Sequence, residues 1–209
     1  MAPQADRAEH WNSAYNDGDE KRSWTEAYPT RSVEAIRSVA PSLDAPIIDI
    51  GAGSSLLAAA LLAEGHTDLT MLDLSEAALD LARDRMGADA ERVNWVAADL
   101  FAWQPVREYA VWHDRAVLHF FTTPNDRVRY AGKLHTALRP GGHAIIATFA
   151  PDGPERCSGL PVWRSSAQGI LDLLGGDFSS QHVSTANHTT PSGSVQPFTW
   201  VVARRLGSD

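Results

Sequence analysis

The chain has 209 residues, which predicts one domain, and its 44% hydrophobic and 21% charged residues exclude a wholly disordered or fibrous protein. Its 18 Lys and Arg residues against 26 Asp and Glu residues give a formal net charge of −8. This charge argues against a dedicated nucleic-acid binder, because such a protein needs a face that neutralises phosphates.

The N-terminal segment, the apolar stretches and the cysteine content together predict a cytoplasmic location. The first 22 residues are rich in charge and lack the apolar run of a secretory signal. The most apolar helical stretch, Leu56 to Ala63, is far shorter than the roughly 20 residues that cross a membrane. The single cysteine, Cys157, forms no internal disulfide, so nothing indicates an oxidising compartment. We therefore expect a soluble protein that binds no membrane.

Hydrophobic periodicity divides the chain into residues 1–45, an N-terminal helical cap, and residues 46–209, the core of a single domain. Two helices are expected in the cap, one from Ala5 to Tyr15 and one that starts near Thr30 behind a proline.

In the core, short apolar strands alternate with helices, which is typical of a largely parallel α/β sheet. The expected strands are 46–50, 69–73, 93–97, 109–113, 143–149, 181–186 and 195–204. The expected helices are 56–64, 75–86, a third from 123 to about 139, and 165–174. The segment Pro151 to Pro161 is rich in Pro and Gly and is expected to be a loop. The turn Thr190-Pro-Ser-Gly193 joins the last two strands, which should therefore pair antiparallel.

The segment Asp49-Ile-Gly-Ala-Gly53 follows the first strand directly. A glycine-rich turn between a first strand and a first helix lets the polar part of a ligand approach the backbone closely. Leu56 stands where the dinucleotide fingerprint has its third glycine, so the turn by itself indicates no particular ligand.

Two acidic residues end the next strands. Asp73 ends the second strand, where a carboxylate accepts hydrogen bonds from ribose hydroxyls. Asp99 follows the third strand, where it can read an adenine amino group while Leu100 covers the ring. Together with the glycine turn, these residues predict a cofactor that contains a nucleoside.

Two further segments complete an ordered set, Trp112-His-Asp-Arg115 at the end of the fourth strand and Leu138-Arg-Pro-Gly-Gly142 before the fifth. Over about residues 45–150 this set resembles the class I S-adenosylmethionine-dependent methyltransferases. The resemblance implies an α/β fold, a Rossmann-like three-layer sandwich, with a seven-stranded sheet of order 3-2-1-4-5-7-6 and strand 7 antiparallel. It also implies S-adenosyl-L-methionine as the cofactor.

The resemblance assigns roles by position. Gly51, Ala52 and Gly53 would lie under the methionine part of the cofactor, and Asp49 would orient that turn or face the amino group. His113 would lie beside the sulfonium. A direct acid–base role for His113 is one expectation, and a stacking or purely structural role is the alternative. The cofactor's nucleoside would contact Asp73 at the ribose, and Leu74, Asp99 and Leu100 at the adenine.

A narrower resemblance concerns His10-Trp-Asn-x-x-Tyr15 and the following Ser23-Trp24. This segment is similar to that of small bacterial methyltransferases, of the thiopurine and tellurite methyltransferase group, and of the lysine methyltransferases that act on elongation factor. The resemblance makes Trp24 a candidate cofactor contact and Trp11 a candidate substrate contact. The alternative is that both rings only anchor the N-terminal helices.

Candidate substrate residues follow the fourth and fifth strands. Asp114 and Arg115 are expected to form an ion pair that shapes the site, and Arg156 and Arg164 are candidates to hold an anionic substrate. The aromatic pair Phe120 and Phe121 is expected in the core rather than in a pocket.

The remaining reactive side chains suggest no further chemistry. Cys157 is not expected to be a nucleophile, because no base is identifiable and methyl transfer needs none. The His residues are dispersed, so no metal site is expected.

The expected function is in-line transfer of a methyl group to a heteroatom of a small-molecule acceptor. Few residues remain for a separate substrate domain, which suits a small substrate under an N-terminal lid. One alternative is a protein lysine N-methyltransferase with an open acidic groove. The other is a non-catalytic or NAD-binding Rossmann protein, against which Leu56 and the pair Asp73 and Asp99 argue.

Overall fold

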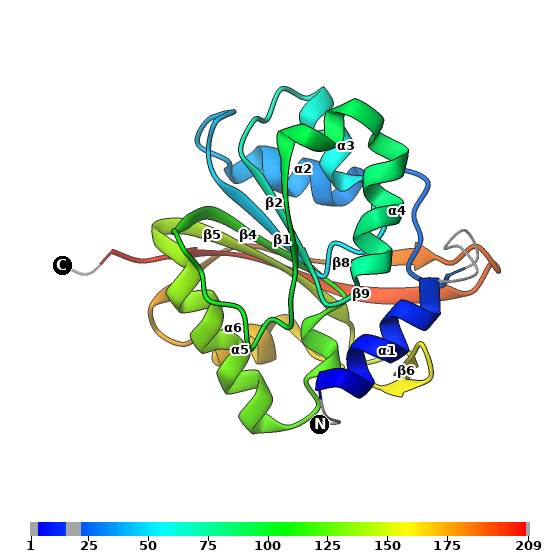
Figure 1. Cartoon of the computed structure of the whole chain (residues 1–209). Coiled ribbons are helices and arrows are strands. Elements are labelled where there is room, and N and C mark those ends of the chain that lie inside the picture. Colours follow the sequence, from blue (N-terminus) through cyan, green and yellow to red (C-terminus); the bar gives the residue numbers. More distant parts are fainter. Residues whose placement is uncertain (1–3, 16–21, 208–209) are drawn as a thin grey trace.

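A seven-stranded sheet with helices on both faces forms the body of the protein (Figure 1). The computed structural model describes residues 4–15 and 22–207. The strands of this sheet are β1 Ile47–Ile50, β2 Leu69–Asp73, β3 Val93–Ala97, β4 Tyr109–Arg115, β5 Leu138–Phe149, β8 Phe178–Thr189 and β9 Val195–Arg205.

The strand order is β3-β2-β1-β4-β5-β9-β8, and β9 runs antiparallel to both of its neighbours. When β8 and β9 are counted as strands 6 and 7, this is the predicted order with strand 7 antiparallel. The predicted fold class is therefore confirmed.

Helices cover the two faces of the sheet. One face carries α2 Thr30–Val39, α3 Leu57–Ala63 and α4 Glu76–Met86, and the other carries α5 Pro124–Ala137 and α6 Ala167–Leu174 (Figure 1). In the part of the chain that the structure describes, no helix is long and apolar enough to span a membrane.

Each face has its own apolar core. Ile47 packs with Ile36 and Leu61 in one cluster, whereas its neighbour Ile48 packs with Leu134 in the other. Consecutive strand residues point to opposite faces, so a strand that is covered on both faces is apolar at most positions. This requirement explains Ile47, Ile48 and Ile50 of β1, whereas the buried Asp49 of the same strand has His113 as its partner. The carboxyl end of β1 lies between the two helical layers.

Side-chain caps start the helices where the sequence predicts them. Ser75 accepts a hydrogen bond from Ala78 N–H at the start of α4, and Thr123 accepts one from Asp126 N–H at the start of α5. Such caps satisfy backbone donors that have no partner within the helix.

Several predicted boundaries differ from the structure. The expected loop 151–161 contains a short hairpin of β6 Arg156–Cys157 and β7 Leu160–Pro161. The strand β5 starts at Leu138 instead of 143, because Leu138 pairs with Tyr109 across a bulge. The strand β8 is longer than predicted, since pairing with β9 stabilises polar residues that have little strand propensity of their own.

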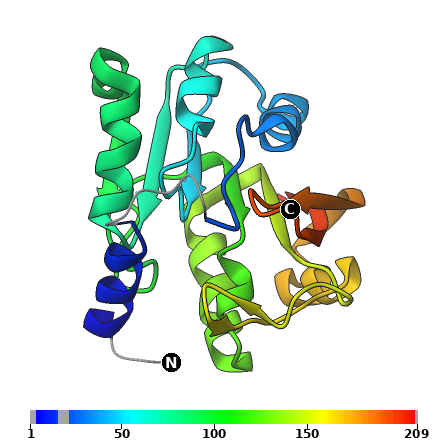
Figure 2. The ribbon, with the colours of Figure 1, turned by 90° about the vertical axis from the view of Figure 1, so that its right-hand side faces the viewer.

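The two helices of the N-terminal segment lie in different places. Val33 and Ile36 bury α2 in the helical layer beside α3. The helix α1 Gln4–Tyr15 instead lies on the side of the molecule that carries the β6–β7 hairpin (Figures 1 and 2). The Ser75 hydroxyl, 2.8 Å from Asn12 Oδ1, connects α1 to the start of α4.

Candidate active site

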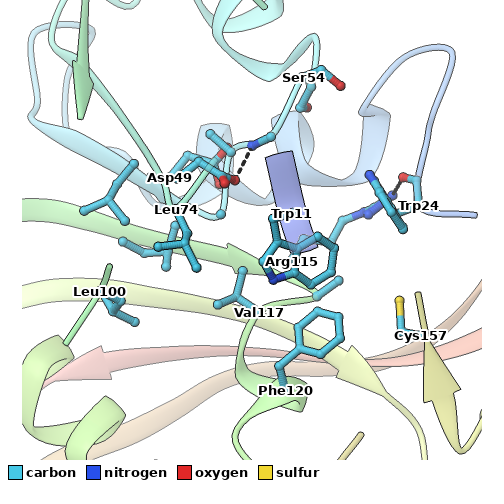
Figure 3. A pocket seen from close by; sticks show the side chains of 18 of the residues that line it. Trp11, Trp24, Asp49, Ser54, Leu74, Leu100, Arg115, Val117, Phe120 and Cys157 are labelled. Carbon is cyan, nitrogen blue, oxygen red and sulfur yellow. Dashed lines mark hydrogen bonds between the residues drawn. The ribbon is translucent and has the colours of Figure 1, made fainter. Parts of the chain in front are cut away.

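A cavity of about 770 Å³ lies at the carboxyl ends of β1 to β4. It is bounded by the turns after these strands, by α1, by the segment that leads into α2, and by the β6–β7 hairpin. In Figure 3, Asp49, Leu74 and Leu100 lie toward one end of this space, and Trp24 and Cys157 lie toward the other. The carboxyl ends of strands in an open α/β sheet are the usual place for a ligand, and the volume suits a small-molecule site.

The glycine turn after β1 comes close to its neighbours. Gly51 and Gly53 have φ angles of +66° and +55°, in the left-handed region that favours glycine. A Cβ on Gly51 would lie 2.1 Å from Val117 Cγ2, and one on Gly53 would lie 2.8 Å from the Tyr15 hydroxyl. A side chain at either position would therefore overlap a residue that packs against the turn.

Asp73 is the last residue of β2 and lies beside this turn. The Gly53 N–H donates to Asp73 Oδ2 at 2.8 Å, and the Ser75 N–H donates to Oδ1 at 2.7 Å. Burial raises the pKa of Asp73 to about 6, against the lowering effect of these two hydrogen bonds. Each carboxylate oxygen keeps a second lone pair, so Asp73 can still accept hydrogen bonds from a ligand in the cavity.

Asp99 occupies the corresponding position after β3. It is buried and forms an ion pair with Arg7 of α1. The Phe101 N–H donates to its other oxygen at 2.7 Å. The adjacent Leu100 and, from the turn after β2, Leu74 supply apolar walls at the same end of the cavity (Figure 3).

Asp49 and His113 face each other across adjacent parallel strands, since they are register partners in the β1–β4 pairing. His113 Nδ1 lies 2.6 Å from Asp49 Oδ1, and Nε2 lies 3.0 Å from Ser32 Oγ on α2. All three side chains are buried. The chain Asp49–His113–Ser32 thus connects the glycine turn to α2 and occupies both ring nitrogens of His113.

The expected ion pair between Asp114 and Arg115 does not form, because neighbouring residues of β4 point to opposite faces. Arg115 points into the cavity, where its guanidinium donates to the Trp24 carbonyl at 2.8 Å and pairs with Glu26 at 3.0 Å. Asp114 is fully buried on the other face and accepts hydrogen bonds from Val117 N–H at 2.9 Å and Tyr130 Oη at 2.7 Å. Burial raises the pKa of Asp114 to about 6.

Aromatic rings line the end of the cavity near α1. Trp11 packs edge-on against Trp24 and Phe120, with ring centroids 5.8 and 5.0 Å away. Trp24 Nε1 donates to the Tyr15 hydroxyl at 3.1 Å. Phe121 lies in the core and Phe120 packs against it, as expected, but both also line the cavity.

Arg156 and Arg164 are not among the residues that line this cavity. Arg156 donates to the Gly159 carbonyl at 2.6 Å, within its own hairpin. Arg164 donates to the Gly153 carbonyl and pairs with Glu155, at 3.1 and 3.2 Å. Their expected contact with an anionic substrate therefore has no support in the geometry. Within residues 4–15 and 22–207, no group of three His, Cys, Asp or Glu side chains is placed to hold a metal ion.

Sequence reasoning missed Arg7, Glu26 and Ser32. Each is a common polar residue without a motif, and each acts on a strand end that lies far along the chain. Only the placement of α1, α2 and the segment between them brings these residues to the site.

Comparisons with known proteins agree with this geometry. Residues 47–142 match the family model of the methyltransferase domain. A comparison with functionally curated proteins found no match.

Many solved structures share the fold, and three of them are similar over nearly the whole chain. An S-adenosylmethionine-dependent methyltransferase from Anabaena variabilis is 15% identical, with a TM-score of 0.74 over 98% of this chain and 96% of that one. The 1,6-didemethyltoxoflavin-N1-methyltransferase of Burkholderia thailandensis, solved with 1,6-didemethyltoxoflavin and S-adenosylhomocysteine, is 23% identical, with a TM-score of 0.72 over 99% of this chain and 92% of that one. The N-methyltransferase NodS of Bradyrhizobium japonicum, solved with S-adenosylhomocysteine, is 15% identical, with a TM-score of 0.65 over 98% and 99% of the two chains.

The narrower resemblance of the N-terminal segment to the thiopurine, tellurite and elongation-factor lysine groups stays a prediction. The match to the methyltransferase domain covers the strands and turns that form most of the cavity, on a sheet of the expected order. Residues 47–142 therefore match the methyltransferase domain, and the whole chain shares its fold with solved S-adenosylmethionine-dependent methyltransferases.

Proposed function

We propose that this enzyme transfers a methyl group from S-adenosylmethionine to a heteroatom of a small molecule that is enclosed beneath α1. The observation that carries the proposal is the continuity of the cavity. A single space runs from the glycine turn and the two strand-end carboxylates to an aromatic-lined end under α1. Such a space has room for a cofactor at one end and an acceptor at the other.

The residues at the first end suit S-adenosylmethionine. We assign Gly51, Ala52 and Gly53 to its amino-acid part, since all three residues line the cavity and the two glycines leave their backbone without side-chain cover. Asp73 would accept from the ribose hydroxyls with its free lone pairs. The adenine would lie between Leu74 and Leu100 and donate its amino group to Asp99.

When bound, the cofactor supplies a methyl group on a positively charged sulfur, whose departure as a neutral thioether needs no covalent help from the protein. The chain's task is to align the acceptor atom and to exclude water. We assign part of this role to Trp24 and Arg115, which line the cavity and are joined by a hydrogen bond from the Arg115 guanidinium to the Trp24 carbonyl.

We assign His113 a positioning role instead of the acid–base role that the sequence suggests. Both of its ring nitrogens are engaged, one with Asp49 and the other with Ser32. His113 therefore holds Asp49 in the orientation that faces the glycine turn. A general base would need a free nitrogen within reach of the acceptor.

The covering of the cavity favours a small acceptor over a protein lysine. Residues of α1 and the segment Trp24–Glu26 line the acceptor end from above. A folded protein substrate needs an open groove for its backbone, and these elements occupy that space. The similar N1-methyltransferase of Burkholderia thailandensis was solved with the small molecule 1,6-didemethyltoxoflavin, which supports the same assignment.

The test has two parts. Calorimetry should show binding of S-adenosylhomocysteine and none of NAD; the reverse result would support the dinucleotide alternative and overturn the proposal. With S-adenosylmethionine labelled in its methyl group, label should pass to the low-mass fraction of a cell extract. Transfer only to the protein fraction would identify a protein methyltransferase instead.

A further inference from the structure

The acceptor end of the cavity has a distinct lining, and we call it the aromatic chamber. Its residues come from α1, the segment before α2, the turn after β4 and the β6–β7 hairpin. They are Trp11, Trp24, Phe120, Cys157, Leu160 and Pro161. In Figure 3, Phe120 lies on one side of an open space and Cys157 on the other.

The rings of the aromatic chamber form a continuous wall. Trp11 contacts both Phe120 and Trp24, with interplanar angles of 71° and 73°. These rings touch one another, so no cation fits between them as it would in an aromatic cage. A wall of this kind offers ring faces and edges to a single ligand. Each favourable ring pair adds about twofold to tenfold to affinity beyond the area that it buries.

The charges at this end are already paired. Arg115 is held by the Trp24 carbonyl and by Glu26, and Glu26 Oε1 lies 3.8 Å from His188 Nδ1. Burial also raises the pKa of the Cys157 thiol to about 11, so this side chain brings no anion. Among the residues 4–15 and 22–207, a charged acceptor would lose its hydration at this end without finding an unpaired opposite charge.

We propose that the aromatic chamber binds an acceptor that is uncharged and carries a flat unsaturated ring system. The inference rests on the proposed function, since it names the class of acceptor for that same site. It also explains why Arg156 and Arg164, the expected anion ligands, have partners outside the cavity.

The test measures binding of four probes of similar size to the complex of the full chain with S-adenosylhomocysteine. The probes are 2-naphthol, its saturated counterpart 2-decalol, the anion 2-naphthoate and the cation 2-naphthylmethylammonium. We expect 2-naphthol to bind about tenfold or more tightly than each of the other three. Equal or tighter binding of decalol or of either ion would overturn the inference.

Two variants test whether 2-naphthol binds in the aromatic chamber. Phe120→Leu and Trp11→Leu should each weaken 2-naphthol binding by about fivefold or more, because each removes one ring of the wall. Trp95→Leu is the matched control, since this ring lies outside the cavity on β3 and should leave naphthol binding unchanged. Because Trp11→Leu also removes contacts of α1, Phe120→Leu is the deciding variant: undiminished naphthol affinity would overturn the assignment.

The two proposals fail in different ways. The affinity for S-adenosylhomocysteine is measured first for every variant and should stay within about threefold of the wild-type value, since the rings lie at the other end of the cavity. Absence of S-adenosylhomocysteine binding by the wild-type protein would overturn the proposed function and this inference with it. Normal binding of S-adenosylhomocysteine without preference for naphthol would overturn this inference alone.

Discussion

Carboxylates at the strand ends line the cavity, and each is held in place by backbone N–H groups, by a side chain, or by both. Asp73 is fixed by two N–H groups, Asp99 by Arg7 and one N–H, and Asp49 by His113. Fixed acceptors of this kind need no reorganisation when a ligand arrives, which favours specific binding. Their positions at consecutive strand ends were readable from the sequence, whereas their partners were not.

We predict that the affinity for S-adenosylhomocysteine depends on pH through the titration of Asp73. Its pKa of about 6 means that the carboxyl takes up a proton as the pH falls through 6 and then accepts hydroxyl hydrogen bonds less well. The affinity for S-adenosylhomocysteine, followed by calorimetry from pH 8 to 5, should be constant above about pH 7 and fall below about pH 6.

The variant Asp73→Asn should bind about tenfold more weakly at pH 8 and lose this pH dependence, since the amide does not titrate in that range. Asp80→Asn, at an exposed site on α4, is the control and should behave as the wild type. An unchanged pH profile in Asp73→Asn would show that another group is responsible.

Among the elements, the turn between β1 and α3 has the tightest requirements. Its two glycines adopt left-handed φ angles, and Gly51 lies under Val117 from the turn after β4. The approach of two strand-end turns to each other therefore depends on the missing Cβ. Both Gly51 and Val117 line the cavity, so their close approach determines its shape at this point.

We predict that Gly51→Ala lowers the free energy of unfolding more than Gly87→Ala does. Both positions have a positive φ, in which an L side chain is strained, so both variants lose stability through the backbone. Only the methyl at 51 overlaps a neighbour, since nothing lies within 4 Å of a Cβ at Gly87. The overlap should add about 1–3 kcal/mol, as measured by chemical denaturation.

Addition of Val117→Ala to Gly51→Ala should recover part of this loss, because it removes the overlapping methyl groups. Equal destabilisation by Gly51→Ala and Gly87→Ala would contradict the close approach of the two turns.

Some boundaries of helices and strands can be predicted from the local sequence, and others cannot. The starts of α4 and α5 were predictable from Ser75 and Thr123, because an N-cap acts within the first turn of its helix. The early start of β5, the full length of β8 and the β6–β7 hairpin depend instead on pairing with other segments. A strand that is stabilised by its neighbour need not look like a strand in isolation.

In the whole molecule, the cavity joins segments from most of the chain. The helix α1, the strand ends of the first half and the β6–β7 hairpin all contribute to one space. A ligand that fills it contacts elements from both sides of the sheet. Its binding energy should therefore add to the stability of the complete fold.

We predict that S-adenosylhomocysteine at about 100 times its dissociation constant raises the free energy of unfolding by about 2.7 kcal/mol. For a chain of this length, the melting temperature should rise by about 5–10 °C. Calorimetric melting of the wild type and of Asp73→Asn, at the same ligand concentration, provides the measurement. If the melting temperature of Asp73→Asn rose by the same amount, Asp73 would not contribute to the binding of S-adenosylhomocysteine.

The sequence by itself determined the alternation of strands and helices and the acids at the strand ends, and its resemblance to the class I methyltransferases implied the sheet order. The strands, helix caps and strand-end acids depend on local patterns, and the carboxyl ends of parallel strands must meet at one edge of the sheet. The tertiary structure alone decided that Arg115 pairs with Glu26, that His113 is enclosed by Asp49 and Ser32, and that Phe120 and Trp11 form one wall. These contacts join residues far apart along the chain, and their partners are chosen by packing rather than by spacing in the sequence.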